Sequence, residues 1–310
     1  MNTLPSNRGL VEAAMIATIA SFFGIGYYYM PTLFLLIFLV PVPFIIITTR
    51  QSLKYGLFSL IVSSLITGIL TDILFTLFLL IFFGPLSLVM GHLIKKDRDD
   101  FTVIGIGSAV SILTIFLFIQ VISLIGGVNI LEHIGMIVRD AIDNQAAALA
   151  SMNLELIDIH YFFNYMMMIF PSLIIIQSIF VTFINYYVSL SILRRLRFSE
   201  RTLPEFSEFK LPANIVLGSF LIMILSYLTR YFENIHTDNL INNVFLIFAV
   251  VFFIQGMASV SFFLKKKGIY KIVRVFIYIL IILISPLLLL VSLLGLLDSM
   301  IDMRKIRQKQ

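Results

Sequence analysis

The chain has 310 residues, of which 60% are hydrophobic and only 13% are charged. A water-soluble domain of this length needs a far more polar surface, so most of the chain must lie in lipid. The absence of cysteine excludes disulfides, thiolate metal ligands and cysteine nucleophiles. The net charge of +5 could indicate a nucleic-acid partner, but the basic residues lie in short connections between apolar runs. There they act as topology signals, so we expect the lipid bilayer as partner and no nucleic acid.

Nine apolar runs are candidate membrane-spanning helices, because backbone groups in hydrocarbon must be hydrogen-bonded within their own segment. They cover residues 11–29, 32–49, 55–71, 73–94, 102–126, 161–193, 213–232, 240–264 and 272–297. The third and fourth runs meet at Asp72 with almost no connection, which predicts a helical hairpin. The predicted fold is an all-α polytopic membrane protein.

The distribution of Lys and Arg predicts a cytoplasmic N-terminus, because cytoplasmic connections are enriched in these residues. With this orientation, 16 of the 22 basic residues lie on the inner side. They are Arg8, Arg50, Lys54, Lys95, Lys96, Arg98, Arg194, Arg195, Arg197, Arg201, Lys210, Lys265, Lys266, Lys267, Lys271 and Arg274. Nine crossings would export the basic tail 304–310. We therefore favour eight crossings with both termini inside, with nine as the alternative, and the pattern does not indicate which run fails to cross.

The first two runs carry the most distinctive patterns. Ala13, Ala17 and Ser21 recur at a spacing of four, and such small residues let another helix approach closely. This face either docks a partner membrane protein or packs within the same bundle. Pro41 and Pro43 break the second run in mid-span, which a membrane tolerates only where the break is buried or lines a cavity. The break is either the wall of a site or a packed kink.

Two polar segments divide the chain. Residues 128–159 alternate apolar and acidic positions and predict one or two amphipathic helices on the outer membrane surface. Residues 194–212 form a basic cytoplasmic loop. We therefore expect an N-terminal membrane block at 1–193 and a C-terminal membrane block at 213–310.

Polar side chains near the outer helix ends indicate a candidate ligand pocket. Tyrosines at this level can instead anchor a helix at the interface, whereas charges at that depth must be paired or hydrated. Arg230 and Glu233 are three residues apart and could pair. The candidate pocket residues are Tyr27, Tyr28, Tyr29, Asp72, Gln120, Arg230 and Glu233.

Four amides lie within the apolar runs: Gln120, Gln177, Asn185 and Gln255. Gln177 and Asn185 are eight residues apart on one helix, which we interpret as one shared face. Such amides either form hydrogen bonds between helices or contact a ligand.

Catalytic patterns are missing from the sequence. The four histidines are scattered, none has a second metal ligand at helical spacing, and there is no glycine-rich phosphate loop. We expect no enzymatic activity, no metal and no cofactor.

Six stretches carry a resemblance to a known family: EAAMIATIA, VPVPFII, RQSLKYG, GLFSLIVSSLITGILTD, GPLSLVMGHLIKKD and LGLLDSMIDMRK. They resemble the YybS-like family, uncharacterised membrane proteins of low-GC Gram-positive bacteria that carry a domain of unknown function. The resemblance covers nearly the whole chain and implies a multi-pass protein of the bacterial cell membrane.

More distantly, the first five segments are similar to the substrate-binding S components of energy-coupling-factor vitamin transporters. That similarity implies that Ala13 and Ala17 dock a coupling component and that substrate binds toward the outer side. The chain departs from this pattern in its acidic surface segment and its three extra C-terminal segments.

Two functions follow as hypotheses. The first is a transporter-like protein that binds a small molecule of unknown identity. The alternative is a structural or regulatory membrane protein that holds partner proteins through its first helix and the loop 194–212.

Overall fold

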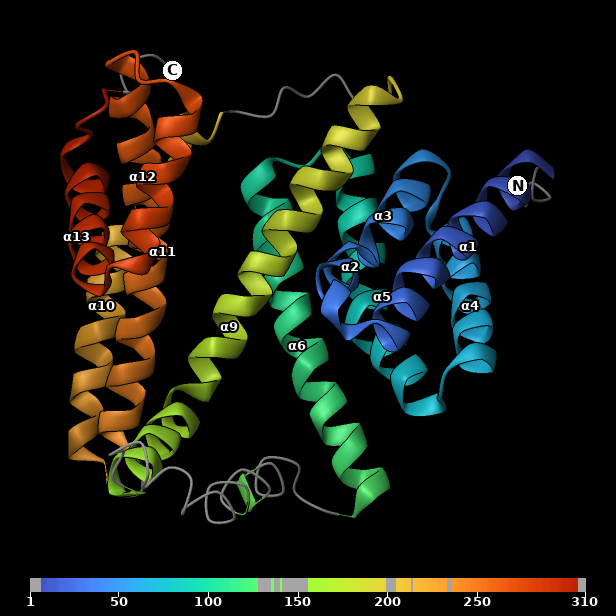
Figure 1. Ribbon diagram of the computed structural model, residues 1–310, viewed down its shortest axis with the longest axis horizontal. Helices are drawn as coiled ribbons and strands as arrows, with labels where there is room; N and C mark the ends of the chain where they lie inside the picture. Colours follow the sequence, from blue (N-terminus) through green and yellow to red (C-terminus); the bar gives the residue numbers. More distant parts are fainter. Residues whose placement is uncertain are drawn as a thin grey trace. The chain divides into compact units, whose positions relative to one another are not determined.

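The computed structural model describes residues 7–127, 135–136, 140, 156–198, 205–212, 214–232 and 236–305. Every regular element in this part of the chain is helical (Figure 1). The helices form two compact units. Unit 1 comprises Met1–His160 and Gln177–Leu203, and unit 2 comprises Tyr161–Ile176 and Pro204–Gln310. The 40-residue helix α9 (Leu156–Arg195) contributes to both units.

Unit 1 is built from the first apolar runs and the second part of α9. Its other helices are α1 (Asn7–Tyr29), the 3₁₀ turn η1 (Pro31–Leu33), α2 (Leu35–Leu39), α3 (Pro41–Arg50), α4 (Leu53–Leu70), α5 (Ile73–Lys95) and α6 (Asp100–Gly126). The predicted hairpin at Asp72 is confirmed: α4 and α5 are joined by two residues, and the Asp72 carboxylate caps α5 by accepting a 2.7 Å hydrogen bond from the Phe75 amide.

The second apolar run is divided at Val40, between α2 and α3. Pro41 and Pro43 occupy the first turn of α3, where a missing amide hydrogen removes no helical bond, so they start a new helix. Both prolines are buried. Packing against α5 buries α3 along its length, and the Thr49 hydroxyl donates to the Gly91 carbonyl at 3.2 Å.

Unit 2 contains the C-terminal runs together with the first part of α9. Its helices are η2 (Phe206–Glu208), α10 (Ile215–Leu228), η3 (Thr229–Tyr231), α11 (Thr237–Lys266), α12 (Lys271–Leu283) and α13 (Ser285–Ile301). The helix α10 has 14 residues and α11 has 30.

The Asn243 side chain forms hydrogen bonds with backbone groups of α9 next to Pro171. It accepts a hydrogen bond from the Ser172 amide at 2.8 Å and donates to the Met168 carbonyl at 2.8 Å. These two groups would otherwise bond each other in a regular helix. A proline displaces the carbonyls of the preceding turn, and in hydrocarbon the groups so released need another partner. Asn243 therefore fixes α9 to α11 within unit 2.

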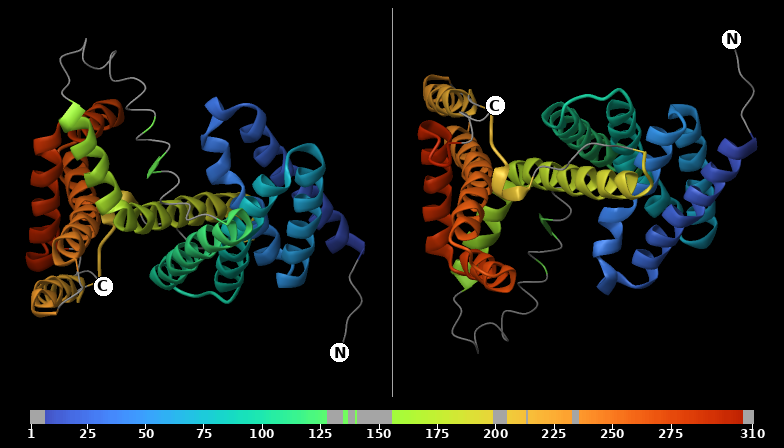
Figure 2. Two further views of the ribbon diagram at one scale, coloured as in Figure 1. Left: turned by 90° about the horizontal axis from the view of Figure 1, so that it is seen from below. Right: turned by 90° about the horizontal axis from the view of Figure 1, so that it is seen from above.

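Helices α11 and α13 run parallel and in backbone contact. The hydroxyl of Ser292 bonds the carbonyl of Ala249, and the amide of Gln255 bonds the carboxylate of Asp298; the two residues of each pair are 43 apart. A constant offset of this kind defines a parallel pair. A Cβ added at Gly295 would lie 1.9 Å from the Phe252 carbonyl oxygen, so the crossing has no room for a side chain. The pair is visible from the side in Figure 1 and from both ends in Figure 2.

The last apolar run forms two helices that meet at a sharp bend. Helices α12 and α13 meet at an angle of 107° next to Pro286. Because α13 is parallel to α11, it ends at the same end of unit 2 as α11 does. The Lys210 ammonium lies 3.8 Å from the Asp302 carboxylate, which places the end of α13 beside the loop 205–212. The pair thus enters and returns, as a re-entrant segment does.

Six helices are long and apolar enough to cross a membrane, or seven if the bent pair counts as one span. The six are Arg8–Tyr29, Leu53–Leu70, Ile73–Lys95, Asp100–Gly126, Asn164–Arg195 and Thr237–Lys266. Two further apolar helices, Leu35–Arg50 and Ile215–Tyr231, are shorter than this length. The all-helical membrane fold is confirmed, whereas length and composition do not reach the expected eight or nine spans. The amphipathic segment 128–159 lies almost entirely outside the described residues.

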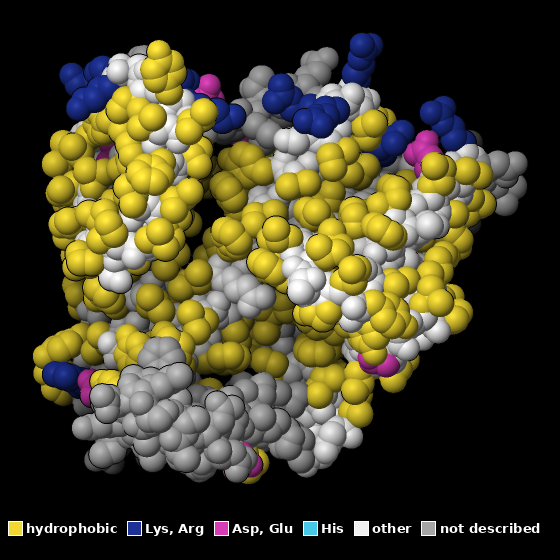
Figure 3. Space-filling model, viewed as in Figure 1, with side chains coloured by type: hydrophobic (Ala, Val, Ile, Leu, Met, Phe, Trp, Pro, Cys, Tyr) yellow, Lys and Arg dark blue, Asp and Glu magenta, His cyan; other side chains and the backbone are white. Residues whose placement is uncertain are grey.

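Charged side chains gather at the helix ends and leave the sides apolar. In each unit, Lys and Arg concentrate at one end, and yellow apolar side chains cover the visible flanks (Figure 3). We call this the basic end of the unit. In unit 1 it includes Arg50, Lys95 and Arg194, and in unit 2 it includes Lys265 and Lys271.

Candidate functional site

A row of buried polar side chains follows one face of α9 in unit 1. Ser178, Thr182, Asn185 and Ser189 are spaced by four, three and four residues, and all four are fully buried. This spacing places them on one stripe of a helix with 3.6 residues per turn. The stripe runs through the part of α9 that packs within unit 1.

Helix α6 meets this stripe at Gly107. A Cβ added there would lie 2.7 Å from the Thr182 methyl group, so the two backbones approach closely. Ser108 and Ser111 follow Gly107 within one turn of α6 and are also buried. We call the six polar residues Ser108, Ser111, Ser178, Thr182, Asn185 and Ser189 the polar seam.

Each residue of the polar seam has a buried oxygen atom with no hydrogen-bond partner in the structure. The Asn185 side-chain nitrogen donates to the Val181 carbonyl at 2.8 Å, which leaves its oxygen unpartnered. Serine and threonine in helices usually bond a carbonyl of the preceding turn, as Ser21 bonds Ala17 at 2.8 Å. The seam hydroxyls do not, so six polar oxygen atoms can accept bonds from water or a polar ligand.

A tyrosine of α9 also joins this helix to α6. The fully buried Tyr186 donates its hydroxyl hydrogen to the carboxylate of Asp100, in the first turn of α6. The neighbouring Asp99 caps the same helix by accepting from the Thr102 amide at 2.9 Å. A hydrogen bond to a carboxylate therefore connects α6 and α9.

The small-residue face of α1 is occupied within unit 1. Ala13 and Ala17 have no exposed surface, and Ser21 is 2% exposed. The hydroxyl groups of Ser21 and Ser63 lie 3.0 Å apart, which joins this face to α4. Of the two alternatives for Ala13, Ala17 and Ser21, this is the geometry of packing within the bundle. Pro41 and Pro43 likewise sit in a packed region, against α5.

The structure brings together four of the predicted pocket residues, Tyr27, Tyr28, Tyr29 and Asp72. Tyr29 donates to the Leu70 carbonyl at 2.5 Å, and the rings of Tyr27 and Tyr28 lie 6.1 and 5.1 Å from a shared phenylalanine ring. Hydrogen bonds from the Phe75 amide and then from the Tyr28 hydroxyl hold the pKa of Asp72 below its ordinary value. These contacts fasten the end of α1 to the α4–α5 turn.

The remaining predicted pocket residues are not joined to this group by any contact shown among the described residues. Gln120 is exposed on α6. Arg230 belongs to unit 2, where its guanidinium lies 4.9 Å from the ring centre of Tyr227 and 3.7 Å from the carboxylate of Asp238. Glu233 lies outside the described residues, so its predicted pairing with Arg230 stays a prediction. Arg230 does line an open polar cavity of 380 Å³, together with Phe232, His236, Thr237, Asp238 and Asn239.

The predicted shared face of Gln177 and Asn185 is wrong, because Gln177 is exposed and Asn185 is fully buried. Eight residues turn an α-helix by about 800°, which leaves the two side chains about 80° apart. Seven residues return to within about 20°, so the partner of Asn185 on its face is Ser178. A search for polar residues at spacings of three, four and seven would have found the seam.

Unit 2 contains a buried charge network that the sequence did not indicate. The Arg304 guanidinium donates to the Asp298 carboxylate at 3.0 Å, and Gln255 donates to the same carboxylate at 2.7 Å. Arg304 also donates to the backbone carbonyls of Ser207 and Phe209, at 2.7 and 2.8 Å. Both charged side chains are 1% exposed. The network fastens α13 and α11 to the loop that precedes α10.

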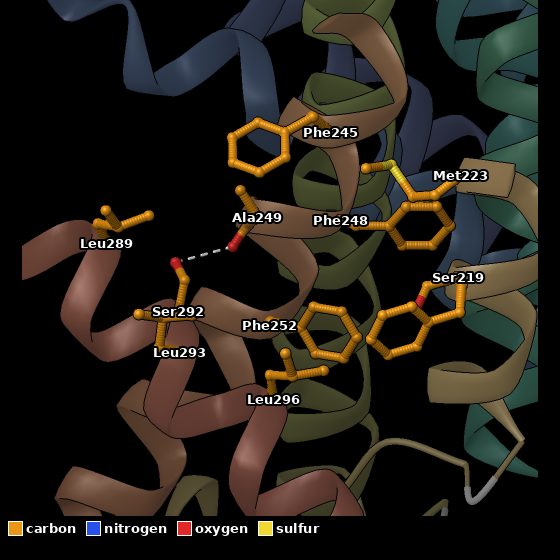
Figure 4. A pocket seen from close by; sticks show the side chains of 11 residues that line it. Ser219, Met223, Phe245, Phe248, Ala249, Phe252, Leu289, Ser292, Leu293 and Leu296 are labelled. Atoms are coloured by element: carbon orange, nitrogen blue, oxygen red, sulfur yellow. Dashed lines mark hydrogen bonds between the residues drawn. The ribbon is translucent and has the colours of Figure 1, made fainter. Parts of the chain in front are cut away.

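An apolar cavity of 190 Å³ lies between α10, α11 and α13 (Figure 4). Its walls are Ser219, Phe220, Met223, Phe245, Phe248, Ala249, Phe252, Leu289, Ser292, Leu293 and Leu296. Among the described residues, no group of three or more His, Asp or Glu side chains is placed to hold a metal ion.

These features define a polytopic helical membrane protein with polar groups buried at two places. Comparison with known proteins then supplies the family. Residues 18–299 match the family described as "Predicted membrane protein (DUF2232)", and the chain belongs to this family. It is 23% identical over 272 residues to "Uncharacterized protein YybS" of Bacillus subtilis (strain 168), a match that covers 85% of this chain and 87% of that protein. No solved structure matches the chain.

The family expected from the sequence is thereby confirmed. Neither match carries the more distant similarity to energy-coupling-factor S components. The matched region 18–299 includes the whole polar seam and Asp298, but it ends before Arg304.

Proposed function

We propose that this chain is a transporter-like protein of the bacterial cell membrane that binds a small polar solute along the polar seam of unit 1. The observation that carries the proposal is the set of six buried oxygen atoms without a partner. An unsatisfied buried polar group costs about 1–3 kcal/mol, so six of them on α6 and α9 favour occupation by water or solute in the working protein.

The chemistry of the seam favours an uncharged ligand. Its six side chains are hydroxyls and one amide, and none carries a charge. A charged solute at this depth would lack a counter-ion, which is expensive in a membrane interior. Hydroxyl groups both donate and accept hydrogen bonds, so they suit a solute that bears hydroxyl or amide groups.

Broken helices support the same class of protein. The division between α2 and α3 and the bent pair α12–α13 interrupt two apolar runs. Discontinuous helices in membranes are typical of transporters, where irregular backbone is tolerated if protein or a polar cavity surrounds it. We assign the basic end of each unit to the cytoplasm, which makes the N-terminus cytoplasmic.

The alternative function, a scaffold for partner proteins, relied on the first helix and on the loop 194–212. The small residues of α1 are covered by α4, and Ser207 and Leu211 of the loop are buried within unit 2. The small-residue surface of α1 is therefore used inside the chain, and this favours the solute-binding proposal.

Cysteine substitution tests the proposal directly, because the natural chain contains no cysteine. Ser111→Cys and Ser178→Cys place a thiol in the seam. Leu190→Cys is buried on another face of α9, and Phe180→Cys lies on an exposed apolar position. Only a thiolate reacts, so a membrane-impermeant charged thiol reagent modifies a hydrated position faster than a lipid-facing or dry one. We expect the two seam variants to react at least about tenfold faster than both controls.

A solute that occupies the seam should slow this modification and raise the melting temperature of the purified protein. A ligand at a hundredfold excess over its Kd stabilises the folded state by about 2.7 kcal/mol, so vitamins, amino acids, polyols and sugars can be screened by thermal shift. If neither seam variant reacts in folded protein, the seam is dry and the proposal is wrong. Recovery of a stable protein partner in the same experiment would then support the scaffold.

A further inference from the structure

The apolar cavity of unit 2 has the properties of a site rather than of a packing defect. Its 190 Å³ exceed the volume of about 150 Å³ in which an apolar cavity accommodates benzene. Figure 4 shows the aromatic rings of Phe245, Phe248 and Phe252 on one side and the leucines of α13 on the other. Empty space of this size forfeits the dispersion contacts of every side chain around it.

The two hydroxyl groups of the lining already donate their hydrogen atoms to backbone carbonyls. The Ser219 hydroxyl donates to the Val216 carbonyl at 2.7 Å, and the Ser292 hydroxyl donates to the Ala249 carbonyl at 3.0 Å. The other nine lining side chains are apolar. A cavity of this kind excludes water and accepts hydrocarbon. The occupant must therefore be an apolar group.

The cavity opens onto the lipid-facing surface. Helix α10 packs mainly on α11 and has few contacts with α13. Between α10 and α13, only the side chains that line the cavity separate it from the surface. Leu217 of α10 and Leu290 of α13 are 75% and 58% exposed, which makes the adjoining surfaces lipid-facing in the membrane. The lining residues of α11 occupy the middle of that 30-residue helix, at the depth of the hydrocarbon layer.

We propose that one acyl chain of a membrane lipid occupies this cavity and completes the contact between α10 and α13. Three observations identify the occupant as lipid: the wholly apolar lining, the opening toward the lipid-facing surface and the depth in the bilayer. The volume corresponds to about six carbon atoms of the chain, by comparison with benzene in its cavity. This inference concerns unit 2 and is independent of the solute proposed for unit 1.

Fluorescence quenching can test the proposal, because the natural chain contains no tryptophan. The variant Phe248→Trp places an indole in the cavity wall. Leu217→Trp serves as the lipid-exposed control, and Phe83→Trp, at a position that is 2% exposed in unit 1, serves as the buried control. The full chain is reconstituted into vesicles of phosphatidylcholine brominated on the acyl chains. We expect Phe248→Trp to be quenched about as strongly as Leu217→Trp, whereas Phe83→Trp retains most of its emission.

A cavity-filling substitution distinguishes an occupying chain from lipid at the surface. Ala249→Phe, combined with Phe248→Trp, fills the space, so we expect it to reduce the quenching at least twofold. Ala249→Ser changes the volume little and should leave the quenching unchanged. If Ala249→Phe lowers the melting temperature strongly, Leu293→Phe fills the cavity from α13 instead. Weak quenching of Phe248→Trp, or quenching that persists in the filled variants, would overturn the proposal.

Discussion

At the scale of single residues, the buried pair of Asp298 and Arg304 stands out. The arginine uses three of its nitrogen atoms, two of them on backbone carbonyls of the loop 205–212. One carboxylate oxygen of Asp298 accepts from both Gln255 and Arg304, and the other is buried without a partner. The main effect of a buried ion pair on stability is the large loss that follows when one of its partners is removed.

We predict that Arg304→Met lowers the free energy of unfolding by about 3–5 kcal/mol, because it leaves the Asp298 carboxylate charged and buried. Asp298→Leu leaves Arg304 similarly uncompensated. The double variant should recover part of the loss, since no unpaired charge remains. Melting of the purified protein in detergent measures all three. A double variant that loses the sum of the two single losses would show that the pair is not coupled.

The residues of the seam and of this network differ in how far the sequence could predict them. Asn185 and Gln255 were recognisable as polar residues within apolar runs. Ser178 and Thr182 were not, because serine and threonine are common in membrane helices. Their hydroxyl groups usually bond a backbone carbonyl of the same helix. Arg304 follows the last apolar run and reads as an ordinary basic tail residue. The burial of Arg304 becomes evident only from the structure, in which α13 runs parallel to α11 and ends beside the loop 205–212.

At the scale of elements, hydrophobicity and proline positions predicted the helices well. All nine apolar runs contain helix, and the hairpin at Asp72 and the break before Pro41 were both expected. The packing partner of each helix was not predictable, because the faces of these helices are apolar all round and periodicity is weak. The small-residue face of α1 could be read as a contact, but not as a contact with α4.

The α1–α4 contact predicts a specific stability defect. Ala17→Leu adds three carbon atoms where the helices meet, and overpacking of a close contact costs about 1–3 kcal/mol. We expect a lower melting temperature of the isolated protein, with insertion into the membrane retained. Met15→Leu, at a position that is 62% exposed on the same helix, should have little effect. Unchanged melting of Ala17→Leu together with the loss of a co-purifying protein would instead identify this face as a docking surface.

At the scale of the whole molecule, the return of α13 favours one of the two expected counts of crossings. If α12–α13 enters and leaves on one side, and Leu35–Arg50 and Ile215–Tyr231 both cross, the chain crosses eight times. The run that does not cross is then the last one, 272–297. Composition left this open, because a run of 26 residues with one proline is compatible with a kinked span as well as with a hairpin.

Reporter fusions test this topology. Fusions after Lys267 and at Gln310 should both report the cytoplasm, because α13 ends at the same end of unit 2 as α11. Fusions after Asp72 and after Asn144 should report the outside. The informative comparison is between Lys267 and Gln310. Opposite sides for these two positions would make 272–297 a true span and raise the count to nine.

The short helix α10 has a mechanical consequence for the bilayer around it. Its 14 residues, continued by the three of η3, are about 27 Å long, whereas the hydrocarbon layer is about 30 Å thick. The neighbouring α11, with 30 residues, is longer than the layer. Lipid beside α10 must therefore compress, at a fraction of a kcal/mol for each ångström of mismatch. If α10 crosses the layer, we expect the membrane beside it to be thinned locally, which would draw the protein toward thin regions of the bilayer.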